Sequence, residues 1–337
     1  MVLTEQSVET SRHRTAWVEA GPTDGPPMIF LHGWPELGIV WRAQVEHFAA
    51  AGWRCVAPDM RGYGGSSAPD TIAAYTAREL VTDMVELHDA LGGEPAIWVG
   101  HDSGSRVAWG MASHHADRRH GVVSLCVPYQ ARGIALPTLV PLVDRDLYPV
   151  ERYPVGQWGY WLFYRERFNE AARQFEANVA ETIAALYGRS SPAAVGKPAM
   201  TATVREKGGW FSPTGPSPSL RRDESMLAAE DFDRLVAAFQ RNGFSGPNAS
   251  YMNDEANLAF AAEAPAFGRL TLPALFIHAA WDTVCATIRS RLAEPMRADC
   301  DDLSEVTIDG GHELMLERPD EVNVAIEQWI RERCPMS

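Results

Sequence analysis

The chain has 337 residues, 46% of them hydrophobic and 22% charged, which suffices for one large folded unit or for a core with a sizeable insertion. Its net charge of −14 argues against binding to nucleic acid or to an anionic membrane surface. No apolar run reaches the roughly 18–20 residues of a membrane-spanning helix, and residues 1–17 lack the apolar stretch of a secretory signal. The five cysteines are scattered and show no metal-ligand spacing. We therefore expect reduced thiols, a cytoplasmic location, and neither a metal nor an organic cofactor.

Short apolar runs alternate with helical patterns in the first third of the chain. The apolar runs predict strands at 28–33, 53–59, 96–101 and 121–127. Apolar residues three and four apart, often followed by glycine, predict helices at 41–52, 77–92 and 104–116. Such alternation is typical of parallel strands joined by helical crossovers.

This alternation stops near residue 133 and resumes near residue 274. Segment 133–255 is rich in aromatic residues and has helical patterns at 169–187 and 229–241, with the loop "GGWFSPTGPSPSL" between them. Strands at 274–279 and 304–309 and helices at 286–298 and 319–333 then follow.

We therefore predict an α/β core built from residues 1–132 and 256–337, with a mostly parallel sheet flanked by helices and a mostly helical cap at 133–255. The insertion leaves and re-enters at the carboxyl ends of strands, where open α/β sheets bind ligands. The cap is thus expected to cover a ligand site.

Asp102 stands where one of the predicted strands turns sharply into a helix, in "AIWVGHDSGSRVAW". Gly100 and Gly104 provide the small neighbours that a strained nucleophile elbow requires. A carboxylate is ionised at neutral pH and needs no base to act as a nucleophile, and the start of the helix would stabilise its charge. The alternative is an ordinary helix N-cap.

Two further candidates follow the last two predicted strands. Asp282 comes directly after 274–279 in "PALFIHAAWDTV", and His312 lies in the loop "DGGHEL" after 304–309. The order Asp102, Asp282, His312 is the nucleophile, acid and histidine order of α/β-hydrolases. Taken singly, an aspartate such as Asp282 is more often a helix cap, and a histidine such as His312 is more often an ordinary loop histidine.

The motif "FLHGWPE" offers the site a backbone donor. The N–H groups of Trp34 and Ser103 are placed to hold a developing oxyanion. The Trp34–Pro35 bond is expected to be cis, since cis bonds occur in tight turns before proline.

At this point the sequence resembles the epoxide hydrolases of the α/β-hydrolase superfamily. The resemblance runs from about Thr15 to Arg331 and is carried by "HGWPE", "PDMRGYGGSS", "VGHDSG", "GGHELMLERPDEV" and the cap segment "NGFSGPNASYMN". It implies hydrolysis of a small-molecule epoxide to a vicinal diol, through an ester on Asp102 that a water activated by His312 then cleaves.

The resemblance also implies roles in the cap. Tyr251 and Tyr160 take the two ring-opening positions, where a neutral phenol donates to the epoxide oxygen. Tyr164, one helical turn from Tyr160, is the alternative second donor. The resemblance further implies four substrate-binding residues, which are His32, Pro35, Trp161 and Tyr164.

Two departures keep other functions open. Many relatives carry tryptophan directly after the nucleophile, where haloalkane dehalogenases use its N–H to hold the departing halide; Ser103 stands there in this chain. Arg106 is the one arginine near the nucleophile, as haloacid dehalogenases would require, or else it only packs on its helix. A dehalogenase and a non-catalytic ligand-binding protein of the same fold are therefore the alternatives, and a homodimer is left open.

Overall fold

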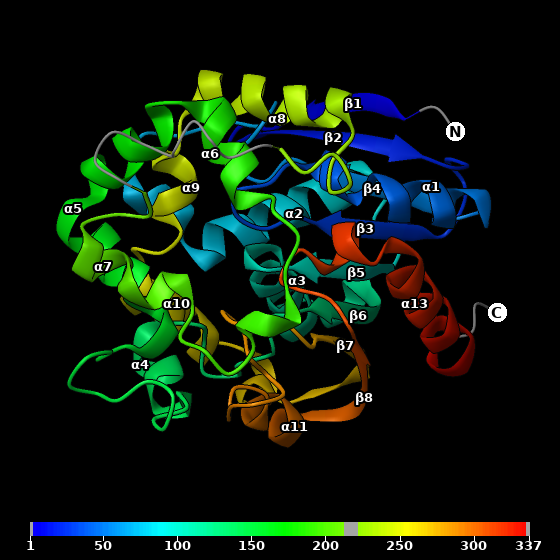
Figure 1. The fold of residues 1–337 in the computed structure, drawn as a ribbon. Coiled ribbons are helices and arrows are strands. Elements are labelled where there is room, and N and C mark those ends of the chain that lie inside the picture. Colours follow the sequence, from blue (N-terminus) through cyan, green and yellow to red (C-terminus); the bar gives the residue numbers. More distant parts are fainter. Residues whose placement is uncertain (1–2, 212–221, 335–337) are drawn as a thin grey trace.

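The computed structural model describes residues 3–211 and 222–334. An eight-stranded sheet forms its centre (Figure 1), in the order β1-β2-β4-β3-β5-β6-β7-β8. The strands are β1 (Thr4–Glu9), β2 (Arg14–Ala20), β3 (Pro27–Leu31), β4 (Arg54–Pro58), β5 (Ala96–His101), β6 (Arg119–Leu125), β7 (Leu270–Ala279) and β8 (Cys300–Ile308). In this order, every neighbouring pair from β4 through β3 to β8 is parallel, whereas β2 pairs antiparallel with both β1 and β4. This confirms the expected mostly parallel sheet.

Helices flank both faces of this sheet. The core helices are α1 (Arg42–Ala50), α2 (Ala77–Ala90), α3 (Ser103–His114), α11 (Glu294–Asp299), α12 (Leu314–Glu317) and α13 (Pro319–Arg333). Right-handed crossovers place α1 on one face and α2 and α3 on the other, because the chain reverses direction along the sheet after β4. Contacts between α1 and α13 and between α2 and α3 agree with that division. The central strands β3 and β5 are buried along nearly their whole length, which explains their continuous apolar runs.

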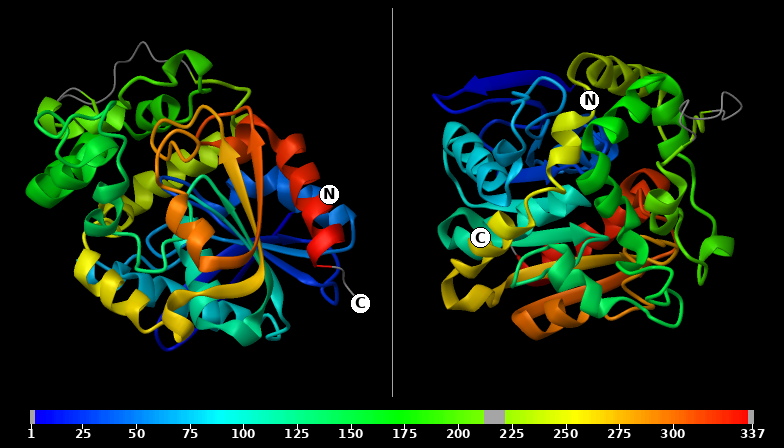
Figure 2. Two further views of the ribbon diagram at one scale, coloured as in Figure 1. Left: turned by 90° about the horizontal axis from the view of Figure 1, so that it is seen from below. Right: turned by 90° about the vertical axis from the view of Figure 1, so that its left-hand side faces the viewer.

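A mostly helical insertion separates β6 from β7. Its helices are α4 (Leu136–Leu139), α5 (Gly159–Glu176), α6 (Val179–Leu186), α7 (Val204–Lys207), α8 (Ala229–Asn242), α9 (Ser245–Ala249) and α10 (Asp254–Ala262). In the left view of Figure 2 the arrowheads of β7 and β8 point toward the green segments of this insertion. The insertion therefore covers the carboxyl edge of the sheet. Its division from the core at residues 133 and 255 stays a prediction.

The sequence prediction missed the hairpin formed by β1 and β2. Five of the six residues of β1 are exposed, so this edge strand lacks the apolar alternation that would have revealed it. β2 has Trp17 and Val18 among its buried residues, but it begins with two polar residues and lacks the continuous apolar run of the central strands.

The predicted helix at 286–298 is wrong over most of its length. Only α11 is helical there, and the residues before it form turns. The Ser290 hydroxyl accepts a hydrogen bond from Leu292 N, and Pro295 lies in the first turn of α11, where proline favours the start of a helix. The pattern at 169–187 was placed too late, since α5 begins at Gly159. Most of the loop "GGWFSPTGPSPSL" lies outside the described residues.

Candidate active site

Asp102 occupies a strained turn between β5 and α3. Its backbone has φ 46° and ψ −119°, a conformation that L-residues rarely adopt. A side chain on either flanking glycine would clash, because a Cβ on Gly104 would lie 2.1 Å from the carbonyl oxygen of Leu31, and one on Gly100 would lie 2.6 Å from Ser105 Cα. The Asp102 carboxylate makes no capping hydrogen bond to α3. The sharp turn therefore aims this carboxylate away from the helix that follows it.

The Asp102 carboxylate instead contacts two groups from other loops. Its Oδ1 accepts a hydrogen bond of 2.9 Å from the backbone N–H of Trp34, and its Oδ2 lies 3.5 Å from His312 Nε2. Burial disfavours the charged form, but the hydrogen bond and the charge of His312 outweigh it and hold the pKa of Asp102 below its usual value. The carboxylate is thus ionised across the physiological range.

His312 is oriented by Asp282. His312 Nδ1 lies 2.7 Å from Asp282 Oδ2, while Oδ1 of the same carboxylate accepts the N–H groups of Val284 (2.7 Å) and Cys285 (2.9 Å). Although burial favours a neutral imidazole, the charge of Asp282 and the hydrogen bonds to both aspartates hold the pKa of His312 well above its usual value. The three residues that were predicted from separate strand ends therefore lie in contact, with His312 between Asp282 and Asp102.

A buried polar network supports the loops beneath these three residues. Glu36 Oε2 accepts the N–H of Gly33 at 2.6 Å, and Glu36 Oε1 lies 2.8 Å from His101 Nδ1. His101 Nε2 in turn lies 2.7 Å from the carbonyl oxygen of His312. Burial raises the pKa of Glu36 to about 7. Glu36 and His101 thereby tie the loop that carries Trp34 to the loop that carries His312.

The expected oxyanion donors are only partly engaged. Trp34 N–H already contacts Asp102, whereas Ser103 N–H donates to no side chain or loop carbonyl within residues 3–211 and 222–334. The Trp34–Pro35 bond is cis, as expected. A Cβ on Gly33 would lie 2.5 Å from Asp102 Cβ, so this loop passes very close to the carboxylate.

A pocket of about 480 Å³ opens over Asp102 between the sheet edge and the insertion. Tyr160 and Trp161 of α5 line it, together with Tyr251, which follows α9. The rings of Tyr160 and Trp161 each lie 5.3 Å from the Tyr251 ring, at steep angles. Burial raises the pKa of both tyrosines, so that both are neutral donors at physiological pH. Neither hydroxyl donates a hydrogen bond to any residue that the structure describes, so both protons are free for a ligand.

Three predicted substrate-binding residues do not line this pocket. Tyr164 is fully buried behind Tyr160 and Tyr251. His32 is also fully buried, where its Nε2 accepts Met60 N–H and its Nδ1 contacts the carbonyl oxygen of Gly33. Pro35 is buried as well, and its carbonyl oxygen accepts the Tyr187 hydroxyl. Contacts between these three positions and a ligand therefore stay predictions. Trp161 does line the pocket.

Sequence reasoning gave no role to Glu36 or His101 and only a conditional one to Arg106, which lines the pocket beside Asp102. Glu36 and His101 both belong to the motifs "HGWPE" and "VGHDSG", so their neighbours in the chain were a usable signal. Arg106 lies one helical turn after Asp102, a spacing that predicts proximity to Asp102 but not the direction in which the Arg106 side chain points.

Comparison with known proteins agrees with this architecture. The alpha/beta hydrolase fold family matches residues 26–319. Epoxide hydrolase A of Mycobacterium tuberculosis is 34% identical over 97% of this chain and 97% of its own length. Bifunctional epoxide hydrolase 2 of Sus scrofa is 31% identical over 94% of this chain and 53% of its own length. The crystal structure of epoxide hydrolase A from Mycobacterium thermoresistibile, 33% identical, superposes with a TM-score of 0.80 over 98% of this chain and 99% of that chain.

The chain is therefore an α/β-hydrolase with a cap, and within that class it belongs to the epoxide hydrolase family. None of its described helices is long and apolar enough to cross a bilayer.

Proposed function

We propose that the protein hydrolyses a small-molecule epoxide to a vicinal diol through a covalent ester on Asp102. The observation that carries this proposal is one shared pocket. It brings an ionised carboxylate together with the hydroxyls of Tyr160 and Tyr251, which have no internal acceptor among the described residues. An epoxide needs both an attacking group and a proton donor on its oxygen.

In the first step, an Asp102 oxygen attacks one ring carbon while the C–O bond to that carbon breaks. The electron pair moves to the epoxide oxygen, which Tyr251 and Tyr160 stabilise by hydrogen bonding and proton donation. The product is a 2-hydroxyalkyl ester of Asp102. Esterification removes the hydrogen bond to the Asp102 carboxylate that helps to raise the pKa of His312, so more of the imidazole is neutral and able to accept a proton when the second step begins.

In the second step, neutral His312 takes a proton from water, and the resulting hydroxide attacks the ester carbonyl carbon. Asp282 stabilises the imidazolium that forms, and the N–H groups of Trp34 and Ser103 hold the oxyanion. Collapse of the intermediate breaks the bond between the carbonyl carbon and the alkyl oxygen. The imidazolium of His312 protonates the departing alkoxide, and the diol leaves. The carboxylic acid of Asp102 returns its proton to the tyrosine that gave one up in the first step and so regains its carboxylate.

The tyrosine pair favours this reaction over dehalogenation. A departing halide needs no proton, and Ser103 offers no indole N–H to hold it. The test is turnover of three matched aryl substrates, which are an epoxide, a haloalkane and a 2-halo acid. Diol formation from the epoxide alone supports the proposal, and halide release without diol formation contradicts it. A cytoplasmic location and a homodimer stay predictions, to be measured by fractionation and light scattering.

A further inference from the structure

Arg106 places a guanidinium group on the wall of the proposed active site. It lies in α3, one helical turn after Asp102, and its guanidinium carbon is 5.0 Å from the centre of the Tyr251 ring and 6.0 Å from that of Trp161. Aromatic faces hold a cation in place without neutralising it. Arg106 is thereby held against one of the proposed ring-opening donors, in the pocket that Asp102 also lines.

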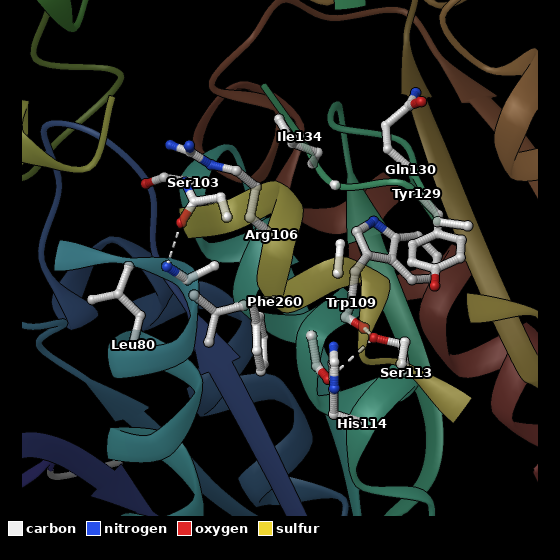
Figure 3. Close-up of a pocket in the computed structure, with 18 of the residues that line it drawn as sticks. Leu80, Ser103, Arg106, Trp109, Ser113, His114, Tyr129, Gln130, Ile134 and Phe260 are labelled. Carbon is white, nitrogen blue, oxygen red and sulfur yellow. Dashed lines mark hydrogen bonds between the residues drawn. The ribbon is translucent and has the colours of Figure 1, made fainter. Parts of the chain in front are cut away.

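Arg106 also stands at the junction of two cavities. It and Ile134 line both the pocket over Asp102 and a second cavity of about 670 Å³ on the outer side of α3. Figure 3 shows Arg106 and Ser103 at one end of this second cavity, away from Ser113 and His114 at the other end. A ligand in either cavity can therefore reach the Arg106 side chain.

The Arg106 guanidinium has no hydrogen-bond acceptor and no ion-pair partner within residues 3–211 and 222–334. Two other arginines with buried or half-buried side chains do have them. Arg42 forms a two-bond pair with Asp231, and Arg61 forms one with Asp83. A guanidinium presents a fork of donors that matches a carboxylate, so an unmatched fork facing a cavity is suited to a carboxylate from outside the chain.

The charges around Arg106 are mostly negative, which bears on the binding of an anionic substrate. Asp102 and Asp282 lie at the site, and the whole chain carries a net charge of −14, so an anionic substrate would otherwise be repelled. An anion at Arg106 would also share a pocket with the nucleophile, because Arg106 and Asp102 both line it.

From these contacts we propose that Arg106 binds a carboxylate of the substrate, and that the preferred substrates are short epoxy acids with the carboxylate on or next to a ring carbon. The inference rests on the proposed epoxide hydrolysis. The apolar walls of the two cavities, which include Val127, Leu139 and Phe260, would receive the rest of such a substrate.

The test compares 3-phenylglycidate with its neutral primary amide, which keeps the ring and the epoxide but loses the charge. Diol formation is measured for the wild type, Arg106→Gln and Arg106→Lys. Arg132→Gln is the matched control, because it removes the same charge from an exposed side chain outside both cavities. Styrene oxide serves as a neutral epoxide without either group.

We expect the wild type to prefer the acid to the amide. Arg106→Gln should lower kcat/KM for the acid about 10- to 150-fold, mainly through KM, as for loss of a hydrogen bond to a charged group. The loss for the amide should be at least about fivefold smaller than for the acid, because any loss common to both reflects only the contacts of Arg106 with Tyr251 and Trp161. Arg106→Lys should recover part of the loss, and Arg132→Gln should match the wild type.

Three results would overturn the inference while leaving epoxide hydrolysis intact. The first is a wild type that turns over the amide at least as well as the acid. The second is an equal loss for acid and amide in Arg106→Gln, which would mean that Arg106 acts on Asp102 or Tyr251 and not on the substrate. The third is an equal loss in Arg132→Gln.

Failure to open any of the three epoxides would instead contradict the proposed function. Binding of cinnamate, which carries the same carboxylate without the epoxide, then decides the inference by calorimetry. Weaker binding to Arg106→Gln than to the wild type and to Arg132→Gln supports the carboxylate site, and equal binding to all three overturns it.

Discussion

The two pocket tyrosines allow a sharp test of ring opening. Tyr160→Phe and Tyr251→Phe each remove one hydroxyl and leave the ring that packs in the pocket. Neither hydroxyl donates to another described residue, so no internal partner loses a hydrogen bond. The cost should therefore fall on the transition state alone. Loss of one oxyanion donor costs about 2.7–4 kcal/mol, which corresponds to a roughly 100- to 1,000-fold slower alkylation step.

The double variant should lose far more than either single one. With both hydroxyls gone, the epoxide oxygen would develop its charge in a buried pocket without a donor. We expect alkylation to become too slow to follow in a single-turnover experiment with enzyme in excess. The assay is rapid quench, with epoxide consumption measured separately from diol release, since only the first step should change.

Tyr164→Phe is the matched comparison. Tyr164 lies in the same helix, one turn from Tyr160, but it is fully buried and does not line the pocket. Its removal should change the alkylation rate by less than about threefold. Equal losses in Tyr164→Phe and Tyr160→Phe, or an unchanged rate in the double Tyr160/Tyr251 variant, would refute this assignment of donors.

Three further predictions concern the acid, the loop and the pH dependence. Asp282→Asn should slow ester hydrolysis by about 10⁴-fold while alkylation continues, because an amide beside His312 Nδ1 favours the imidazole tautomer that cannot accept a proton from water at Nε2. Rapid-quench detection of accumulated ester checks this, and equal slowing of both steps would contradict it. Gly33→Ala should slow alkylation at least tenfold with the fold intact by circular dichroism, because its Cβ would meet Asp102 Cβ. Lowering the pH should slow ester hydrolysis first, because that step requires neutral His312 and the pKa of His312 is raised. Alkylation should instead stay constant up to about pH 10, the ordinary tyrosine pKa. The reason is that the pKa of Asp102 is lowered and the pKa values of Tyr160 and Tyr251 are raised. Stopped-flow rates of the two steps across pH would show whether they separate in this direction.

The meeting of Asp102, Asp282 and His312 could be predicted from the sequence, because a local pattern marks the position of each residue. Glycines at 100 and 104 mark the elbow of Asp102, and Asp282 and His312 each come just after an apolar strand. Parallel strands bring their carboxyl ends to one edge, so three distant segments meet without any knowledge of the packing.

The pocket wall was less predictable, because it depends on how the insertion packs. Tyr160 and Tyr164 are both on one helix, one turn apart, and nothing in their spacing tells which of them faces the cavity. His32 and Pro35 lie within two residues of Trp34 in the chain, yet their contacts with Met60 and Tyr187 hold them in the interior. The β1–β2 hairpin was missed because its edge strand buries little, and its stability comes from pairing with distant β4.

The covalent step is the central claim, and it has one direct measurement. His312→Gln removes the base for ester hydrolysis and leaves Asp102 and both tyrosines in place. Intact-protein mass spectrometry after exposure to an epoxide that the wild type turns over should show protein heavier by one substrate. Peptide mapping should then place the added mass on Asp102. A folded His312→Gln protein that stays unmodified, or that carries the substrate on another residue, would contradict the ester mechanism.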